Sequence, residues 1–213
     1  MTIGLSGDGR LVLDAADRIL RETCSKELVD AAEAGTWPGE LWGTLEASGL
    51  PRACAPAHLG GAELSLAEGL ALLRLVGEHA VPVPLAETLI ATWLLGGAGA
   101  EEVPEGPLSL LVADEGLDVE TDGSGQVLTG RLERVPFAPV AGRVLVVLPE
   151  DAGATLVLID PAGRLAEPGV NLAGEPLADL VLEGLRPDAG ACYRTGRDAG
   201  SIRALMALTR ALM

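Results

Sequence analysis

Apolar residues recur at spacings of three and four through the first part of the chain, to about Gly97, which is the period of an amphipathic helix. In the first such stretch, over residues 11–23, Val12, Ala16, Ile19 and Leu20 fall on one face. The same period predicts three further helices, over residues 37–48, 66–79 and 84–96. This part of the chain is therefore expected to form a helical bundle.

Polar residues at the starts of two of these helices predict how they are capped. Thr36 precedes the second helix, with Pro38 tolerated in its first turn and Gly49 just past its end. Ser65 and Glu68 have the spacing of a capping box, in which each side chain satisfies a free backbone N–H of the other's turn. We therefore expect the third helix to begin directly after Ser65.

From about Pro107 the helical period gives way to short apolar runs, which are typical of strands. The runs predict strands over residues 108–112, 119–121, 126–129, 144–148, 155–159 and 177–182. Residues 122–125, with the sequence DGSG, suit a hairpin turn between the second and third of them. Because the strands follow one another without helices between them, we expect an antiparallel sheet and an α+β class.

The end of the chain returns to the helical period, with one apolar face made by Ile202, Leu205, Met206, Thr209 and Leu212. No Gly, Asn or Pro follows to end this helix, so we expect it to pack against a further segment or a partner subunit. The expected organisation is an N-terminal helical bundle domain over residues 1–99, a small antiparallel β-barrel or β-sandwich domain over residues 107–186, and the first helix of a truncated C-terminal helical domain over residues 198–213.

Composition narrows the possible functions without naming one. The 15 basic and 31 acidic residues give a net charge of −16, which disfavours binding to nucleic acids and to anionic membrane surfaces. Two apolar stretches, residues 64–76 and 85–99, are short and contain charged residues, so neither is expected to span a bilayer. The N-terminus lacks a signal-peptide pattern, and three widely spaced cysteines indicate free thiols, so we expect a cytoplasmic protein.

The chain contains no self-contained catalytic motif and no metal-binding motif. His58 lies in a loop rich in Pro and Gly, His79 lies at a helix end, and neither has a nucleophile or carboxylate at a diagnostic spacing. Structural roles are the simpler interpretation for both histidines. Glu63, Glu68 and Glu87 are likewise expected to lie at the surface or to cap helices, and we assign no catalytic residue.

Three strings in the helical part resemble the first domain of the acyl-CoA dehydrogenase family. They are LWGTLEASGL at residues 41–50, PAHLGGAELS at residues 56–65 and VGEHAVPVPLAET at residues 76–88. In that family a helix with a Trp and a Gly leads into a loop with paired glycines, and a later turn carries a Pro, a Glu and a Thr. The last string is the strongest single match.

The β part resembles the same family in order and register. Residues 130–141, GRLERVPFAPVA, align without a gap on the family's strand beside the flavin, and residues 176–185 resemble the strand before the C-terminal helices. By position, this alignment implies Arg134, Val135 and Pro136 as the cofactor-binding residues. Two departures stand out. Arg134 replaces an aromatic that shields the flavin, and Pro136 replaces a Thr and lacks a backbone N–H.

A further departure lies before the hairpin. A family segment whose hydroxyl and backbone meet the flavin is replaced by residues 109–115, SLLVADE.

The resemblance implies FAD-dependent α,β-dehydrogenation of an acyl-CoA thioester, with residues 84–95 lining the acyl pocket. It also implies an electron-transferring flavoprotein or a similar acceptor as a partner, and a homo- or hetero-oligomer of dehydrogenase subunits. The family's catalytic base usually comes from C-terminal helices beyond Met213. Two alternatives remain open. One is a non-catalytic partner subunit that binds no flavin productively, and the other is an unrelated α+β ligand-binding module.

Overall fold

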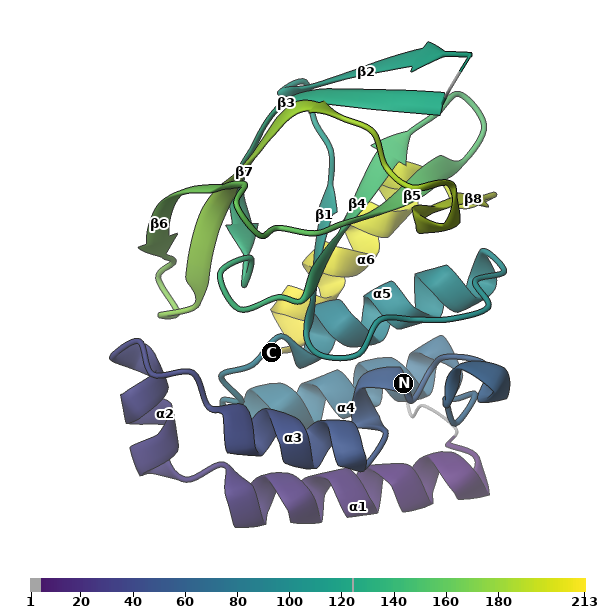
Figure 1. The fold of residues 1–213 in the computed structure, drawn as a ribbon. Coiled ribbons are helices and arrows are strands. Elements are labelled where there is room, and N and C mark those ends of the chain that lie inside the picture. The colour runs from purple at the N-terminus through teal and green to yellow at the C-terminus, as the bar shows by residue number, and fades with distance from the viewer. Residues whose placement is uncertain (1–4, 124) are drawn as a thin grey trace.

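The computed structural model describes residues 5–123 and 125–213, and its helices and strands occupy separate layers (Figure 1). Five helices form the lower layer of that view, while α6 runs against the sheets of the upper layer. The helices are α1 (Gly7–Thr23), α2 (Lys26–Glu33), α3 (Gly39–Ala47), α4 (Leu66–Glu78), α5 (Leu85–Gly97) and α6 (Ala199–Leu212). Two short 3-10 helices, η1 (Leu50–Arg52) and η2 (Ala57–Leu59), lie between α3 and α4, and a third, η3 (Ala189–Ala191), follows the strands up to residue 185.

The strands form two four-stranded sheets, with the orders β1-β4-β5-β8 and β2-β3-β7-β6. Their bounds are β1 (Leu108–Val112), β2 (Leu117–Asp122), β3 (Gly125–Pro136), β4 (Arg143–Pro149), β5 (Ala154–Ile159), β6 (Leu165–Val170), β7 (Pro176–Leu185) and β8 (Cys192–Thr195). The two sheets make an open sandwich, and the mixed α+β class is as expected from the sequence. One pairing differs from the antiparallel prediction, because β1 runs parallel to β4.

The two hydrophobic clusters show how these layers pack. One lies between the helices and the first sheet, and the other lies between the two sheets. Strand β4 contributes to both clusters. Leu145 and Val147 belong to the first cluster, while Val144, Val146 and Leu148 belong to the second. A strand buried on both faces reads as a continuous apolar run, which explains its pattern in the sequence.

Glu68 fixes the start of two helices at once. The predicted capping box is present, with Ser65 donating its backbone N–H (2.9 Å) and its hydroxyl (2.7 Å) to Oε2 of Glu68. The other oxygen, Oε1, accepts the backbone N–H (2.8 Å) and the hydroxyl (2.6 Å) of Ser6, the N-cap residue of α1. These four hydrogen bonds hold the pKa of Glu68 down at about 2 and join α1 to α4.

The expected cap at Thr36 is wrong. The helix begins at Gly39, and Pro38 occupies the N-cap position without a side-chain hydrogen bond. The chain turns instead at Gly35, whose φ of 93° places it in the left-handed region that favours glycine. Gly49, with a φ of 75°, does follow the helix end as predicted.

The sequence pattern also missed three elements. These are α2, which is short and has no fully buried residue, and the strands β6 and β8. The hairpin predicted at residues 122–125 is present as the β2–β3 pair, in which Asp122 faces Gly125. Ser124, in its turn, lies outside the described residues.

The apolar face predicted for the last helix points inward. Ile202 and Thr209 are buried, and Leu205, Met206 and Leu212 are half-buried, while α6 packs on α4, β1 and β4. Asp198 caps its start by accepting the backbone N–H of Ser201 at 2.8 Å. Within the described part of the chain, none of the helices has the length and apolar character needed to cross a membrane.

Candidate functional site

A cavity of about 420 Å³ lies where the helical layer meets the second sheet and the end of α6. Its wall comes from the α2–α3 loop, the α4–α5 turn and the β6–β7 turn, with much of it apolar. Trp37, Val76, Val81 and Phe137 supply large apolar side chains. Glu33, Asn171, Glu175 and Arg210 supply the charged and amide groups. A cavity of this size and composition suits a small apolar ligand with a few polar atoms.

Arg210 brings together two carboxyl groups from different layers. Its guanidinium lies 3.6 Å from Glu87 on α5 and 3.9 Å from Glu175 in the β6–β7 turn. Glu175 in turn accepts the side-chain amide of Asn171 at 2.5 Å. The cation thus ties the helical layer, α6 and the second sheet together at one side of the cavity.

Glu87 is buried, with 8% of its side chain exposed. Loss of hydration raises the pKa of this carboxyl to about 7, with the Glu175 carboxylate adding to the rise and Arg210 opposing it. Such a group can give up or take up a proton near neutral pH. The sequence analysis expected Glu87 at the surface or in a cap, and the expectation of a surface position is wrong because the residue is buried. Glu68 does cap a helix, as predicted.

The three residues expected beside a cofactor lie at a bulge near the end of β3. The register of β3 with β7 shifts between Leu132 and Val135, and Arg134 has a φ of 52°. Its backbone N–H donates to Oδ1 of Asp179 at 2.7 Å. Arg134 is exposed, whereas Val135 and Pro136 are buried. Of the three, only Arg134 presents its side chain to the surroundings.

Asp179 holds this bulge in place from the neighbouring strand β7. Its other oxygen, Oδ2, accepts Nε of Arg131 at 2.6 Å and pairs with that guanidinium at 2.5 Å. The hydrogen bond from the Arg134 N–H is the main cause that keeps the pKa of the Asp179 carboxyl below its usual value, and the Arg131 guanidinium lowers it further. A buried carboxylate with these partners fixes the conformation of the bulge.

Ser109 joins the two segments that resemblance to the dehydrogenase family singled out. Its side chain is fully buried on β1, and its hydroxyl donates to the carbonyl of Pro136 at 2.5 Å. The next residue, Phe137, has a φ of 54° and donates its N–H to the carbonyl of Pro176 at 2.7 Å. The segments over residues 109–115 and 134–136 thus meet through the hydrogen bond between Ser109 and Pro136.

These contacts decide how well the bulge suits a flavin. The backbone N–H of Arg134 donates to Asp179 and that of Phe137 donates to the carbonyl of Pro176. Pro136 has no backbone N–H. The hydroxyl of Ser109 is used as well. The bulge therefore does not fit a flavin that would take hydrogen bonds from these groups.

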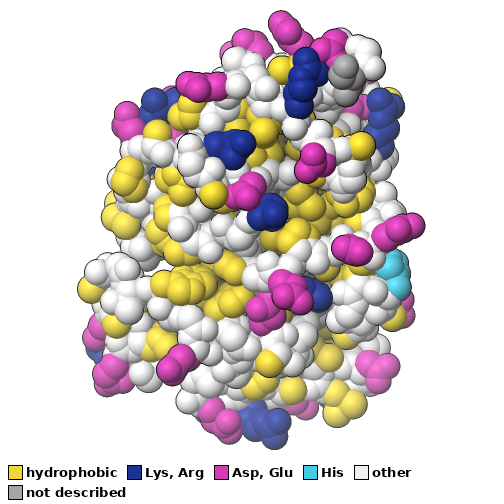
Figure 2. Space-filling view, in the orientation of Figure 1, with side chains coloured by type: hydrophobic (Ala, Val, Ile, Leu, Met, Phe, Trp, Pro, Cys, Tyr) yellow, Lys and Arg dark blue, Asp and Glu magenta, His cyan; other side chains and the backbone are white. Residues whose placement is uncertain are grey.

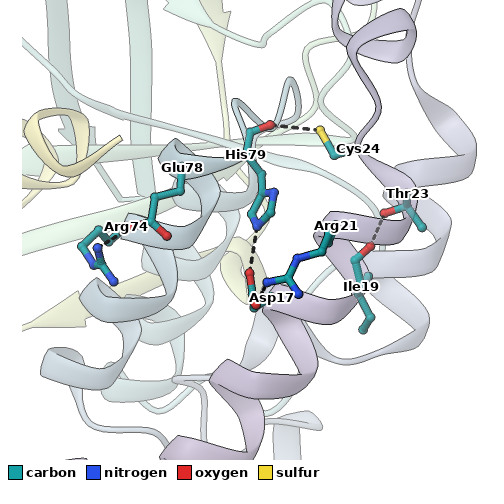
Figure 3. A network of polar contacts seen from close by, with 8 residues as sticks. All are labelled: Asp17, Ile19, Arg21, Thr23, Cys24, Arg74, Glu78 and His79. Carbon is teal, nitrogen blue, oxygen red and sulfur yellow. Dashed lines mark hydrogen bonds and ion pairs between the residues drawn. The ribbon is translucent and has the colours of Figure 1, made fainter.

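The histidines have structural contacts. Nε2 of His79 lies 2.9 Å from Oδ1 of Asp17, which ties the end of α4 to α1, and the carbonyl of His79 accepts the thiol of Cys24 (Figure 3). His58 contacts the carbonyl of Ala100 at 3.2 Å. The partner of His79 is far away in sequence, so no local spacing could have revealed it.

Neither the metal-ligating side chains nor the surface charge of the described residues indicates a further site. Across residues 5–123 and 125–213, no group of three or more His, Cys, Asp or Glu side chains is placed to hold a metal ion, and all three cysteines are free thiols. Acidic side chains are scattered over the face shown in Figure 2, and apolar side chains run across its middle. We take the cavity and the β3 bulge as the candidate sites.

No known family model and no curated protein sequence matches the chain. Solved structures do match it over nearly its whole length. The ChsE4–ChsE5 complex from Mycobacterium tuberculosis gives a TM-score of 0.78 at 22% identity, covering 100% of this chain and 64% of that one. Butyryl-CoA dehydrogenase from Megasphaera elsdenii gives 0.71 at 13% identity, covering 100% and 65%. The chain has the acyl-CoA dehydrogenase fold.

A variant of the Tcur3481–Tcur3483 steroid ACAD agrees with this assignment. Its TM-score is 0.74 at 22% identity, and the match covers 96% of this chain and 60% of that one. The chain therefore spans 60 to 65% of the length of these acyl-CoA dehydrogenase-fold structures. The fold predicted from the short strings at residues 41–88 and 130–141 is confirmed, although identity this low establishes the fold alone.

Proposed function

We propose that this chain belongs to the acyl-CoA dehydrogenase family and works in the α,β-dehydrogenation of an acyl-CoA thioester. The observation that carries the proposal is the agreement of the fold with butyryl-CoA dehydrogenase over 100% of this chain and with a steroid ACAD over 96% of it. FAD, as the hydride acceptor, supplies the redox chemistry in such a reaction. We assign no catalytic base to this chain, and the domain boundaries at residues 99 and 107 remain predictions.

The cavity is where we place the acyl group. It has a mainly apolar wall, a volume in the range of small-molecule sites, and a position between the helical layer and the second sheet. The sequence prediction put the acyl pocket along residues 84–95. The turn just before that helix, at Ala80, Val81 and Pro82, lines the cavity, whereas most of α5 is buried in the core. We therefore propose that the acyl group meets the entrance to α5 and not its length.

Further dehydrogenase subunits are the partners that we propose, with an electron-transferring flavoprotein or a similar protein as electron acceptor. The ChsE4–ChsE5 structure is a complex of two differently named chains, which supports a hetero-oligomer. Location in the cytoplasm stays a prediction.

The visible spectrum tests the proposed reaction. The chain is purified together with a co-expressed dehydrogenase subunit, and an acyl-CoA series is added without oxygen. We expect a flavin band that bleaches as the flavin is reduced. A preparation that has no flavin band, or a band that no acyl-CoA bleaches, would reject the function.

Calorimetric titration with octanoyl-CoA tests the cavity. Ala32→Phe narrows the cavity from α2 and should weaken binding by about tenfold or more, because about 1.4 kcal/mol of lost contact corresponds to tenfold in affinity. Ala34→Phe, at an exposed position outside the cavity, is the matched control. Equal affinities of the two variants would place the acyl group elsewhere.

A further inference from the structure

We infer that the β3 bulge of this chain, residues 134–137, is closed to flavin and that the flavin of the proposed assembly is held by its partner subunit. The inference rests on the proposed function and assigns the cofactor within it. It reverses the prediction that resemblance alone made for Arg134, Val135 and Pro136.

The first argument is the use of the polar backbone groups. A flavin ring has carbonyl oxygens and ring nitrogens that need hydrogen-bond donors when water is excluded. At the bulge, the N–H of Arg134 is given to Asp179 and that of Phe137 to Pro176, while Pro136 has none. The carbonyl of Pro136 is also taken, by the hydroxyl of Ser109. A flavin at this position would have to compete with bonds inside the β-sandwich.

The second argument is that these bonds are costly to break. Freeing the Arg134 N–H means moving Asp179, a buried carboxylate that also binds Arg131. Freeing the Ser109 hydroxyl means moving a fully buried side chain. Buried polar groups that lose a partner without gaining another destabilise the fold. The bulge is therefore expected to keep its present contacts when a ligand is offered.

The third argument is the orientation of the side chains. Val135 belongs to the cluster between the sheets and Pro136 is buried, so neither offers an exposed surface for a ring to stack on. Arg134 and Phe137 both have positive φ, which sets the direction of the chain at the two ends of the segment. Phe137 lines the neighbouring cavity. Of residues 134–136, only Arg134 has an exposed side chain, and the resemblance places a ring-stacking aromatic there.

The decisive experiment is to count flavin in the purified complex of this chain with a co-expressed dehydrogenase subunit. FAD is released by denaturation and measured by absorbance against the amount of each chain. One FAD for each pair of chains supports the inference. Two FAD molecules for each pair, or none, would overturn it, as would saturable binding of FAD to this chain alone.

Charge reversal at the bulge gives an independent measurement. In the complex, Arg134→Glu should leave the flavin absorption maxima and the midpoint potential unchanged, as should the control Arg18→Glu at an exposed position on α1. Arg134→Gln repeats the test without an added negative charge next to Asp179, in case the Glu variant folds poorly. A shifted potential in the Arg134 variants alone would mean that the bulge touches flavin.

The two proposals fail in different ways. A complex with one FAD for each pair, whose band no acyl-CoA bleaches, keeps the flavin assignment and rejects the dehydrogenase reaction. A complex that bleaches with acyl-CoA but holds two FAD molecules for each pair keeps the reaction and rejects the assignment.

Discussion

Replacing Glu87 by glutamine should change how the stability of the protein depends on pH. Burial raises the pKa of this carboxyl from an ordinary 4.5 to about 7 in the folded chain. Between those two values the folded state keeps a proton that the unfolded state has released. The free energy of unfolding therefore falls as the pH rises through this window.

The size of the effect follows from the two pKa values. Their difference corresponds to about 3 kcal/mol of stability, at about 1.4 kcal/mol for each pH unit. Glutamine resembles the protonated carboxyl and does not titrate, so Glu87→Gln should match the parent protein near pH 4.5. It should then exceed the parent protein in stability by up to about 3 kcal/mol near pH 8. The nearby Arg210 and Glu175 stay in place in both proteins.

Urea unfolding followed by circular dichroism across this pH range measures the difference. Subtracting the two proteins removes the contribution of every other titrating group that they share. Glu33→Gln replaces an exposed carboxylate that lines the nearby cavity and is the control for the loss of an acidic side chain in this region. Parallel pH profiles for the parent protein and Glu87→Gln would refute the reasoning from burial.

Three other predictions concern how the parts of the fold are joined. Thr88→Val should lower the free energy of unfolding by about 1–3 kcal/mol in urea titrations, because the buried N–H of Leu108 loses the hydroxyl that it now meets at 3.0 Å; an unchanged midpoint would contradict this. Glu68→Gln should lower stability near neutral pH and flatten the loss of stability as the pH falls from 4.5 towards about 2, since the folded pKa lies below the ordinary one. Unfolding of the parent protein and of Glu68→Gln at a series of acid pH values measures how the free energy of unfolding changes with pH. Identical slopes for the two proteins would argue against the four hydrogen bonds to Glu68. Limited proteolysis with a Glu-specific protease should cut first within residues 99–107, the predicted linker, which contains three glutamates. Protection there would count against that domain boundary.

The sequence pattern located most elements because each has one local cause. The helices at α1, α4 and α5 follow from apolar spacing, and Ser65 with Glu68 marks a helix start that needs only neighbouring residues. The pattern missed β6 and β8 because β6 is largely exposed and contains Pro168, and β8 has only four residues. Their place in a sheet depends on the strands beside them, β7 and β5.

The parallel pairing of β1 with β4 was missed for a different reason. The two strands are separated by the β2–β3 hairpin, so successive order in the chain suggested successive antiparallel neighbours. A chain that crosses to a second sheet and returns can bring a distant strand alongside in the same direction. Local composition carries no information on that crossing.

The candidate sites divide in the same way. From the sequence alone came the acyl-CoA dehydrogenase fold, the segments 109–115 and 134–136, and the absence of an N–H at Pro136, because these depend on residue types in order along the chain. The contact of Ser109 with Pro136 and the hold of Asp179 on Arg134 required the packed sheets. So did the meeting of Glu87, Glu175 and Arg210, three residues from three separate elements. Burial and nearby charges shift the pKa of a carboxyl group, and a packed neighbour can accept the hydrogen bond of a backbone N–H. Burial and these contacts exist only once the chain has folded.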